Sequence, residues 1–303
     1  MSGIVGIGAC VADTLTMLPV FPAEDTKLRA LGVKRCGGGP VSTGLIAAAR
    51  LGVDCGYIGI LSDDENGRFL LEDFQKYGVD TTHIQMASGY RSFTSYIWLN
   101  ARKGSRTCVF DKGNLPPLKL TAGQKEAVKA ADVLMVDGNE LDAAVQAAGL
   151  ARKNGVHVLY DAGGLYDGVE QLLKLTDILI PSEEFALEYT REDNISMAAK
   201  RLYEEYHPEV VVITRGKLGG LLYDGQNFTV YPIYPAQVVD SNGAGDVFHG
   251  AFAAGIIFGY TYEQCCHFAS AVSALKCTGM GARESVPTRG AVMELLRRNG
   301  YAI

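Results

Sequence analysis

Short apolar runs alternate with longer amphipathic segments along most of the chain. After about residue 120, "ADVLMVD", "VHVLYDA", "DILIPS" and "EVVVITRG" are separated by segments with helical periodicity. Runs that are apolar at almost every position are typical of strands buried on both faces. Their regular alternation with helices predicts a parallel sheet covered by helices. We therefore expect an α/β protein with a central, mostly parallel sheet.

The first hundred residues follow the same pattern with two exceptions. "GIVGIGAC" and "DCGYIGIL" are predicted strands, and "PVSTGLIAAARLG" and "NGRFLLEDFQKYG" are predicted helices. Residues 13–36 look irregular, whereas residues 90–111 alternate in polarity around "ARKG" and predict a β-hairpin. Together these two segments are expected to form a small β lid beside the main sheet.

The end of the chain predicts a second hairpin and three helices. "GGLLYDG" and "NFTVYPI" form the hairpin, and the helices cover residues 245–258, 261–278 and 288–298. The length of 303 residues allows one large α/β domain or two ordinary ones. Since no repeat or low-complexity linker is present, we expect one domain over residues 1–303, with the lid formed by about 13–36 and 90–111.

Charge and cysteine usage narrow the partners and the compartment. The formal net charge is 28 − 34 = −6 and no basic run occurs, which argues against nucleic-acid binding. None of the seven cysteines forms a C-x-x-C pair, so reduced core thiols and a cytoplasmic location are expected. The N-terminus has no basic region before its apolar run, and no apolar stretch is long enough to span a bilayer.

The segment "DSNGAGDVFHGAFAAGI" at 240–256 carries the most chemistry. Gly243 and Gly245 flank Ala244, and a helical pattern follows at once. The first N–H groups of a helix have no partner inside it, so they form a ready site for a phosphate. Asp246 lies in that first turn, where the helix dipole favours an ionised carboxylate. An anion cradle beside a carboxylate base suits phosphorylation of a hydroxyl, although a plain turn with Asp246 as a helix cap explains the pattern as well.

These residues resemble a known family. "D-S-N-G-A-G-D" resembles the C-terminal signature D-T-x-G-A-G-D of the ribokinase-like (PfkB) carbohydrate kinases. Further segments match in order across nearly the whole chain: "GACVAD", "CGGGPVSTGLIAAARLG", "VVVITRGKLGG" and "SALKCTGMGARESVP". The pairing of "GGGP" with "KCT…G…R…P" is most similar to the branch that includes sulfosugar kinases.

The resemblance implies an ATP-dependent kinase that phosphorylates a hydroxyl of a small sugar or sugar derivative, with ATP, Mg²⁺ and K⁺ as cofactors. It implies Asp246 as general base and the backbone of Gly243, Ala244 and Gly245 as an anion hole. Asp13 suits hydrogen bonds from two hydroxyls, although a turn residue ending the first strand is the alternative. The remaining implied contacts are Asp13, Gly38 and Gly39 to the sugar, Thr214, Gly216 and Gly219 to the nucleotide phosphates, and Ser270 near the nucleobase.

Several positions depart from the family pattern. Ser182 and Phe185 stand where many members carry the Asn and Glu of N-x-x-E. Glu183 or Glu184 is therefore expected to reach magnesium through water, unless ATP holds the metal or both glutamates only open a helix. The resemblance places K⁺ between backbone carbonyls with Asp240 and the loop 276–285.

The same loop carries two unusual residues, Lys276 and Gly279. Gly39 and Ser42 also depart, because many members carry Lys and Asn there.

Other polar residues are weaker candidates. Lys27 is a cation in the lid segment and Asn139 follows a strand, so both are expected to contact substrate, although an exposed lysine is commonly only solvated. His249 is expected to be packed or at the surface rather than in the cleft. Lid strands that pair between subunits would give a homodimer.

Other enzyme classes fit poorly. "GIGACV" lacks the third glycine of a dinucleotide fingerprint, and no Walker A, G-x-S-x-G or H-E-x-x-H motif is present. A nucleoside kinase and a catalytically inactive sugar-binding sensor of the same fold stay open as alternatives.

Overall fold

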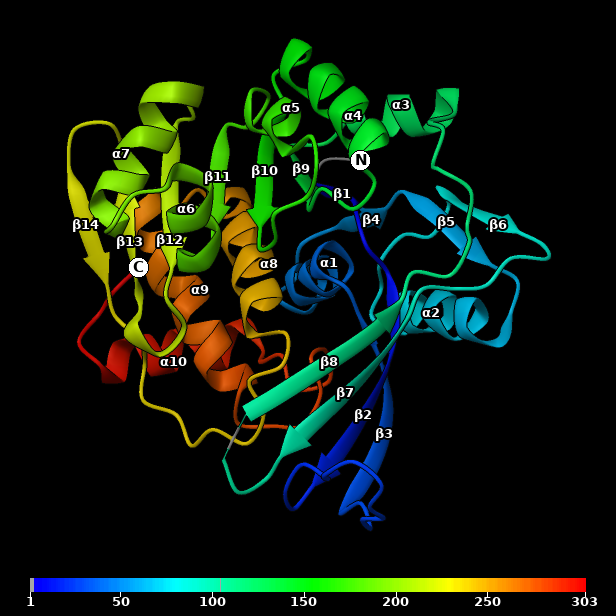
Figure 1. Cartoon of the computed structure of the whole chain (residues 1–303). Helices are drawn as coiled ribbons and strands as arrows, with labels where there is room; N and C mark the ends of the chain where they lie inside the picture. Colours follow the sequence, from blue (N-terminus) through cyan, green and yellow to red (C-terminus); the bar gives the residue numbers. More distant parts are fainter. Residues whose placement is uncertain (1–2, 104) are drawn as a thin grey trace.

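A computed structural model describes residues 3–103 and 105–303 and places eight strands in one central sheet (Figure 1). Neighbouring strands are parallel from β4 to β12, whereas β13 and β14 continue the sheet as an antiparallel hairpin. In spatial order the strands are β14 (Phe228–Tyr231), β13 (Gly220–Tyr223), β12 (Val210–Thr214), β11 (Ile178–Pro181), β10 (His157–Ala162), β9 (Val133–Val136), β1 (Ile4–Ile7) and β4 (Cys55–Tyr57).

Helices cover both faces of this sheet and create two hydrophobic cores. Strand β9 shows why its sequence is apolar throughout, because Val133 and Met135 enter one core while Leu134 and Val136 enter the other. One face carries α1 (Pro40–Arg50), α8 (Ala244–Ile257), α9 (Tyr262–Lys276) and α10 (Arg289–Arg298). The opposite face carries α3 (Ala122–Lys129), α4 (Leu141–Lys153), α5 (Val169–Leu173), α6 (Glu183–Thr190) and α7 (Ile195–Tyr206).

The lid is a four-stranded sheet that projects from the main body (Figure 1). Its order is β3 (Gly32–Gly38), β2 (Val11–Leu18), β7 (Thr94–Asn100) and β8 (Ser105–Asp111), with β2 and β7 parallel. The predicted hairpin is confirmed. The prediction that residues 13–36 are irregular is wrong for both ends of that segment, since the prolines Pro19 and Pro22 interrupt only the connection between two strands.

The first strands are shorter than their apolar runs because the chain changes sheets there. Strand β1 ends at Ile7, and after a short link the chain enters the lid as β2. The run predicted as one strand at 54–61 is divided into β4 and β5 (Gly59–Ser62). Strand β5 leaves the central sheet to pair with β6 (Ile84–Ala87), and α2 (Glu65–Lys76) packs against β5 and the base of the lid. These exchanges bring the lid to the carboxyl end of β1, where ligands of parallel sheets bind.

Across residues 3–103 and 105–303, no helix combines the length and apolar character needed to cross a membrane. Six of the seven cysteines are buried as expected, whereas Cys108 on β8 is exposed.

Candidate active site

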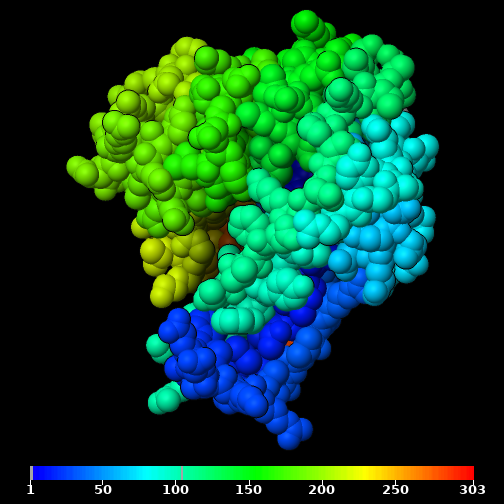
Figure 2. All heavy atoms as spheres, turned by 45° about the vertical axis from the view of Figure 1, so that its right-hand side comes forward, coloured from blue at the N-terminus to red at the C-terminus, as the bar shows by residue number. Residues whose placement is uncertain are grey.

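A cavity of about 180 Å³ lies between the lid and the body. It brings together four residues from distant parts of the sequence that were predicted to act on substrate: Asp13, Gly38, Gly39 and Asp246. Figure 2 shows a hollow between the teal lid atoms and the green and yellow body, with orange atoms of the C-terminal helices inside it. The other residues that line the cavity are Val11, Pro40, Phe93, Ser95, Ile97, Cys108, Phe110, Asn242 and Ala282.

Asp13 is held at the lid side of this cavity. It lies on β2 with 5% of its surface exposed, and Ser95 Oγ on β7 donates a hydrogen bond of 2.6 Å to its Oδ1. Burial raises the pKa of Asp13 to about 6, while the Ser95 hydrogen bond opposes that shift. A Cβ added to Gly38 would collide with Asp13 Oδ2, so the glycine leaves the space that this carboxylate occupies. One carboxylate oxygen therefore has a protein donor, and the carboxylate faces the cavity.

Asp246 lies in the first turn of α8. Gly243, the residue before the helix, has a φ of 73°, a left-handed conformation that favours glycine. Burial raises the pKa of Asp246, and the opposing positive groups include His249 and Arg106. The sequence argument relied on the helix dipole to keep this carboxylate ionised, whereas burial here shifts its pKa upward. A base must be able to take up a proton, and a raised pKa favours that.

The residues that the family resemblance assigns to the nucleotide gather around the carboxyl end of β12. Thr214 ends β12, Gly216 begins a short 3₁₀ turn, and Gly219 follows that turn with a φ of 77°. A Cβ on Gly219 would collide with the Tyr231 carbonyl oxygen and lie close to Pro232. From the other side, Ser270 Oγ on α9 donates to the Pro232 carbonyl oxygen at 2.6 Å. The structure thus brings Gly219 and Ser270 to the same segment of chain.

Glu183 has an ion pair beside these residues. Its Oε1 lies 3.0 Å from Arg215 Nε, and Ser182 caps α6 by accepting from the Phe185 N–H at 3.1 Å. No group of three or more His, Cys, Asp or Glu residues suited to a metal ion occurs within the described ranges. A magnesium ion held chiefly by ATP and water would need no such cluster.

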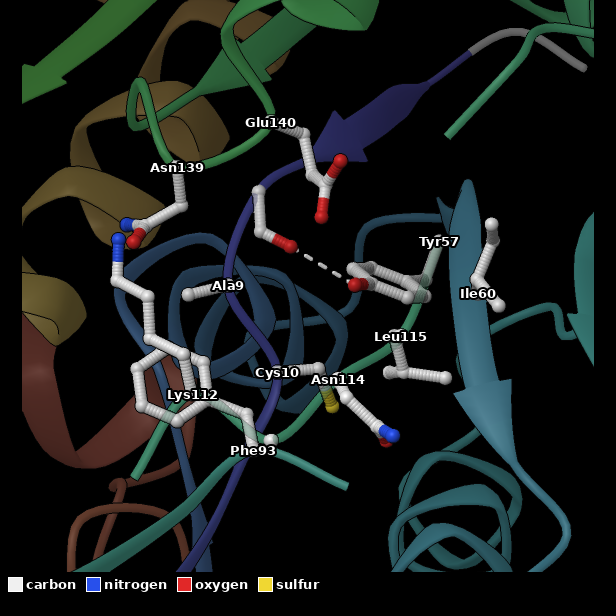
Figure 3. A pocket seen from close by; sticks show the side chains of 12 residues that line it. Ala9, Cys10, Tyr57, Ile60, Phe93, Lys112, Asn114, Leu115, Asn139 and Glu140 are labelled. Carbon is white, nitrogen blue, oxygen red and sulfur yellow. Dashed lines mark hydrogen bonds between the residues drawn. The ribbon is translucent and has the colours of Figure 1, made fainter. Parts of the chain in front are cut away.

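A second cavity, of about 190 Å³, adjoins the first at Phe93 (Figure 3). Asn139 and Lys112 lie close together on its wall in Figure 3, with Glu140 above and Asn114 below. The Asn139 backbone N–H and its Nδ2 donate to Asp137 Oδ1 at 3.0 and 3.2 Å. Asn139 is therefore fixed in place on the wall of this cavity, and its contact with substrate stays a prediction.

Lys27 is not brought to either cavity. It lies exposed in the connection between β2 and β3. The pairing of Met17 with Gly32 places this connection at the end of the lid opposite to Asp13 and Gly38. A solvated lysine, the alternative considered from the sequence, describes its surroundings in this structure.

Two buried polar residues to which the sequence motifs assigned no role support the chain after β1 and at the end of β3. Asp137 Oδ2 accepts from the Ala9 and Val41 N–H groups at 2.8 and 3.3 Å, which joins β1 to the start of α1. Arg283 is 1% exposed and bonds the Gly38 carbonyl. The signal that could have found Arg283 is an arginine within a segment of small residues near a predicted ligand loop.

His249 is buried, as expected, rather than lining the cavity. Its Nδ1 is 2.7 Å from the Gly245 carbonyl oxygen and its Nε2 is 3.0 Å from the Ile180 carbonyl oxygen. Asp161 Oδ2 lies 3.2 Å from Nδ1. This set of acceptors suits a ring that donates from both nitrogens. His249 therefore anchors the first turn of α8 to β11.

Comparisons with known proteins identify the family of the chain. The family model described as "pfkB family carbohydrate kinase" matches residues 1–289. The chain is 26% identical to a ribokinase of Haemophilus influenzae over 96% of this chain and 97% of that protein. It is 27% identical to a 5-dehydro-2-deoxygluconokinase of Clostridium perfringens, over 88% and 85%. The structure of an Arabidopsis thaliana ribokinase complexed with ribose and ATP superposes with a TM-score of 0.86 at 25% identity, covering 98% of this chain and 99% of that one.

Proposed function

Because the chain belongs to the pfkB family of carbohydrate kinases and is an ATP-dependent kinase of that type, we propose that Asp246 is the base that activates a sugar hydroxyl. The observation that carries this proposal is the convergence of Asp13 and Asp246 on one cavity at the start of α8. One carboxylate orients the sugar through hydrogen bonds, and the other receives the proton of the attacking hydroxyl.

The proposed step balances as a phosphoryl transfer. The substrate oxygen forms a bond to the γ-phosphorus of ATP while the bond from that phosphorus to the β–γ bridging oxygen breaks, and ADP leaves. The hydroxyl proton passes to Asp246. Charge on the transferred group is received by the N–H groups at the start of α8, which have no acceptor inside the helix. Magnesium, when bound, would neutralise the ATP phosphates.

We propose that Thr214, Gly216, Gly219 and Ser270 bind ATP. Gly216 and Gly219 bring backbone close to the space after β12, and Ser270 lies across Pro232 from Gly219. Glu183 and Arg215 flank the same strand end, where a water held by Glu183 can reach a phosphate-bound magnesium ion. ATP and the sugar then approach the start of α8 from opposite sides.

A small polyhydroxy substrate suits the cavity better than a nucleoside. Asn139, Lys112 and Glu140 in the adjoining cavity provide hydrogen-bonding groups for the remote end of the sugar. Such a wall favours hydroxyls or an acidic group over an aromatic base, and we place Asn139 among the substrate contacts.

The proposal is tested by measuring ADP release with a panel of hexoses, pentoses, ketose phosphates, sugar acids and nucleosides. We expect turnover with a member of the sugar classes. Turnover confined to nucleosides would favour the nucleoside kinase. Saturable sugar binding by calorimetry with no ADP release from any compound would favour the sensor.

We also propose that the lid pairs with a second copy of the chain. Its outer face exposes four apolar side chains at neighbouring register positions: Val33 (67%), Tyr96 (55%), Trp98 (40%) and Val109 (58%). Exposed apolar patches of this kind commonly mark protein interfaces. Sedimentation should give a dimer for the parent, and Trp98→Glu should shift it toward the monomer. A monomeric parent would reject this interface.

A further inference from the structure

Lys276 is completely buried at the end of α9, directly behind the loop that begins α8. We call residues 240–246 the anion loop. Lys276 Nζ donates to the Asp240 carbonyl oxygen at 2.9 Å and also to the Asn242 carbonyl oxygen. These are backbone oxygens of the kind that the family resemblance assigned to K⁺. The ammonium group of Lys276 thus lies beside the carbonyls that the resemblance assigned to K⁺.

The other groups expected to hold K⁺ are already engaged. Asp240 Oδ1 accepts from the Asn242 N–H at 2.8 Å, and Oδ2 accepts from the Gly281 N–H at 2.9 Å. The Asp240 carbonyl oxygen accepts a hydrogen bond from Lys276 Nζ. A potassium ion needs several oxygen ligands, and here the set is arranged around an ammonium and two amides. The residues present do not fit a bound monovalent cation.

The contacts of Lys276 also set the direction of the anion loop. In a planar trans peptide the C=O and the following N–H point in opposite directions. Lys276 draws the Asn242 carbonyl toward α9, so the Gly243 N–H points away from α9. One turn earlier on α9, Ser273 Oγ donates to the Ala244 carbonyl at 2.9 Å, which turns the Gly245 N–H in the same way. Two side chains of one helix therefore orient alternate peptide groups of the anion loop.

We propose that the buried ammonium of Lys276 replaces a monovalent cation in this kinase, so that phosphoryl transfer needs no K⁺. Lys276 is a positioning residue, because its ammonium bonds backbone carbonyls of the anion loop. Its charge also adds to the positive potential at the start of α8, where the transferred phosphoryl group is expected. This inference rests on the proposed kinase function for its kinetic consequences but not for its binding consequences.

The first test compares the parent protein in KCl and in tetramethylammonium chloride at equal ionic strength, with ATP and the best sugar of the panel. The expected kcat values agree within about twofold, because the cation is part of the chain. Activation by K⁺ of about fivefold or more would overturn the proposal.

The second test removes the ammonium. In tetramethylammonium chloride, Lys276→Ala should lower kcat by about tenfold or more, and K⁺ or methylammonium should restore part of it by entering the space left. Ser273→Ala is the matched control: it removes a neighbouring hydrogen bond and leaves the charge, so its smaller loss should not respond to K⁺. A Lys276→Ala protein with parental kcat, or with a loss that neither small cation reverses, would show a purely structural lysine.

Thermal unfolding supplies a readout that needs no turnover. K⁺ should raise the Tm of Lys276→Ala above its value in tetramethylammonium, while the parent shows no such difference. A K⁺-specific rise in the parent Tm would overturn the proposal even if no sugar were phosphorylated. Failure of the sugar panel would reject the proposed function alone, since this measurement would still decide the role of Lys276.

Discussion

Two glycine-rich loops face the substrate cavity, and each begins one of two helices that pack together. Residues 37–39, here called the sugar loop, precede α1, and the anion loop leads into α8. In each loop, a backbone carbonyl accepts a hydrogen bond from a buried cation that lies at or just after the end of α9. Arg283 Nη2 donates to the Gly38 carbonyl oxygen at 2.7 Å, and Lys276 Nζ donates to the Asn242 carbonyl oxygen. Each also has a carboxylate in the cavity, Asp13 or Asp246.

The difference between the two cations explains their separate tasks. Arg283 Nη1 lies 2.6 Å from Asp73 Oδ2, so a carboxylate in direct contact balances its charge. Its other donors bond the hydroxyls of Ser42 and Thr43. Lys276 bonds neutral carbonyls, and among residues 3–103 and 105–303 no ion pair joins it to a carboxylate. A paired arginine with a fixed fork is a structural anchor, whereas the bonded partners of the Lys276 ammonium are neutral carbonyls of the anion loop.

The largest expected effect is on folding. Arg283→Met leaves the largely buried Asp73 carboxylate without its partner and should lower the free energy of unfolding by about 3–5 kcal/mol, measured by urea denaturation. The double variant Arg283→Met with Asp73→Leu is the control and should recover much of the loss, because no uncompensated charge remains. A single variant as stable as the parent would mean that Arg283 is no anchor.

An intermediate effect is expected at Asp13, where the pKa gives its sign. Between pH 4 and about 6 the folded protein keeps a proton that the unfolded chain loses, so Asp13 lowers stability as pH rises through this window. At pH 8 the free energy of unfolding of Asp13→Asn should therefore exceed that of the parent by about 2–3 kcal/mol, and the two should differ little near pH 4. Its sugar KM should rise. Thermal unfolding across this pH range provides the check, and a pH-independent difference would contradict the assigned pKa.

The smallest expected effects come from glycine substitutions, one in each loop. Gly38→Ala should raise the sugar KM by about tenfold, because the new Cβ collides with Asp13. Gly245→Ala meets no atom within 4 Å, so its Tm should stay near that of the parent and any loss should fall on kcat. The comparison would fail if Gly245→Ala proved the less stable of the two in a melting experiment.

The sequence predicted the elements of the central sheet well because its strands are apolar on both faces and its helices carry clear end signals. Asp246 and the glycines before it were singled out for a related reason, since the glycines and the helix start form a local sequence pattern. Lys276 and Arg283 were not assigned these roles, because a buried cation has no periodicity and its acceptors lie 34 to 245 residues away along the chain. The strand character of residues 13–18 was missed in part because one of the two partner strands of β2, β7, is more than 75 residues distant along the chain.

The central claim is that Asp246 accepts the proton of the sugar hydroxyl, and Asp246→Asn tests it most directly. The exchange keeps the shape of the side chain and removes the proton acceptor. We expect kcat to fall by about 10²–10⁴-fold, with ATP affinity close to that of the parent. The Tm should be no lower than that of the parent, because burial raises the pKa of Asp246. Glu263→Gln, at an exposed carboxylate in the first turn of α9, controls for the general effect of charge at a helix start and should leave kcat unchanged. Turnover by Asp246→Asn within a few-fold of the parent would contradict the account.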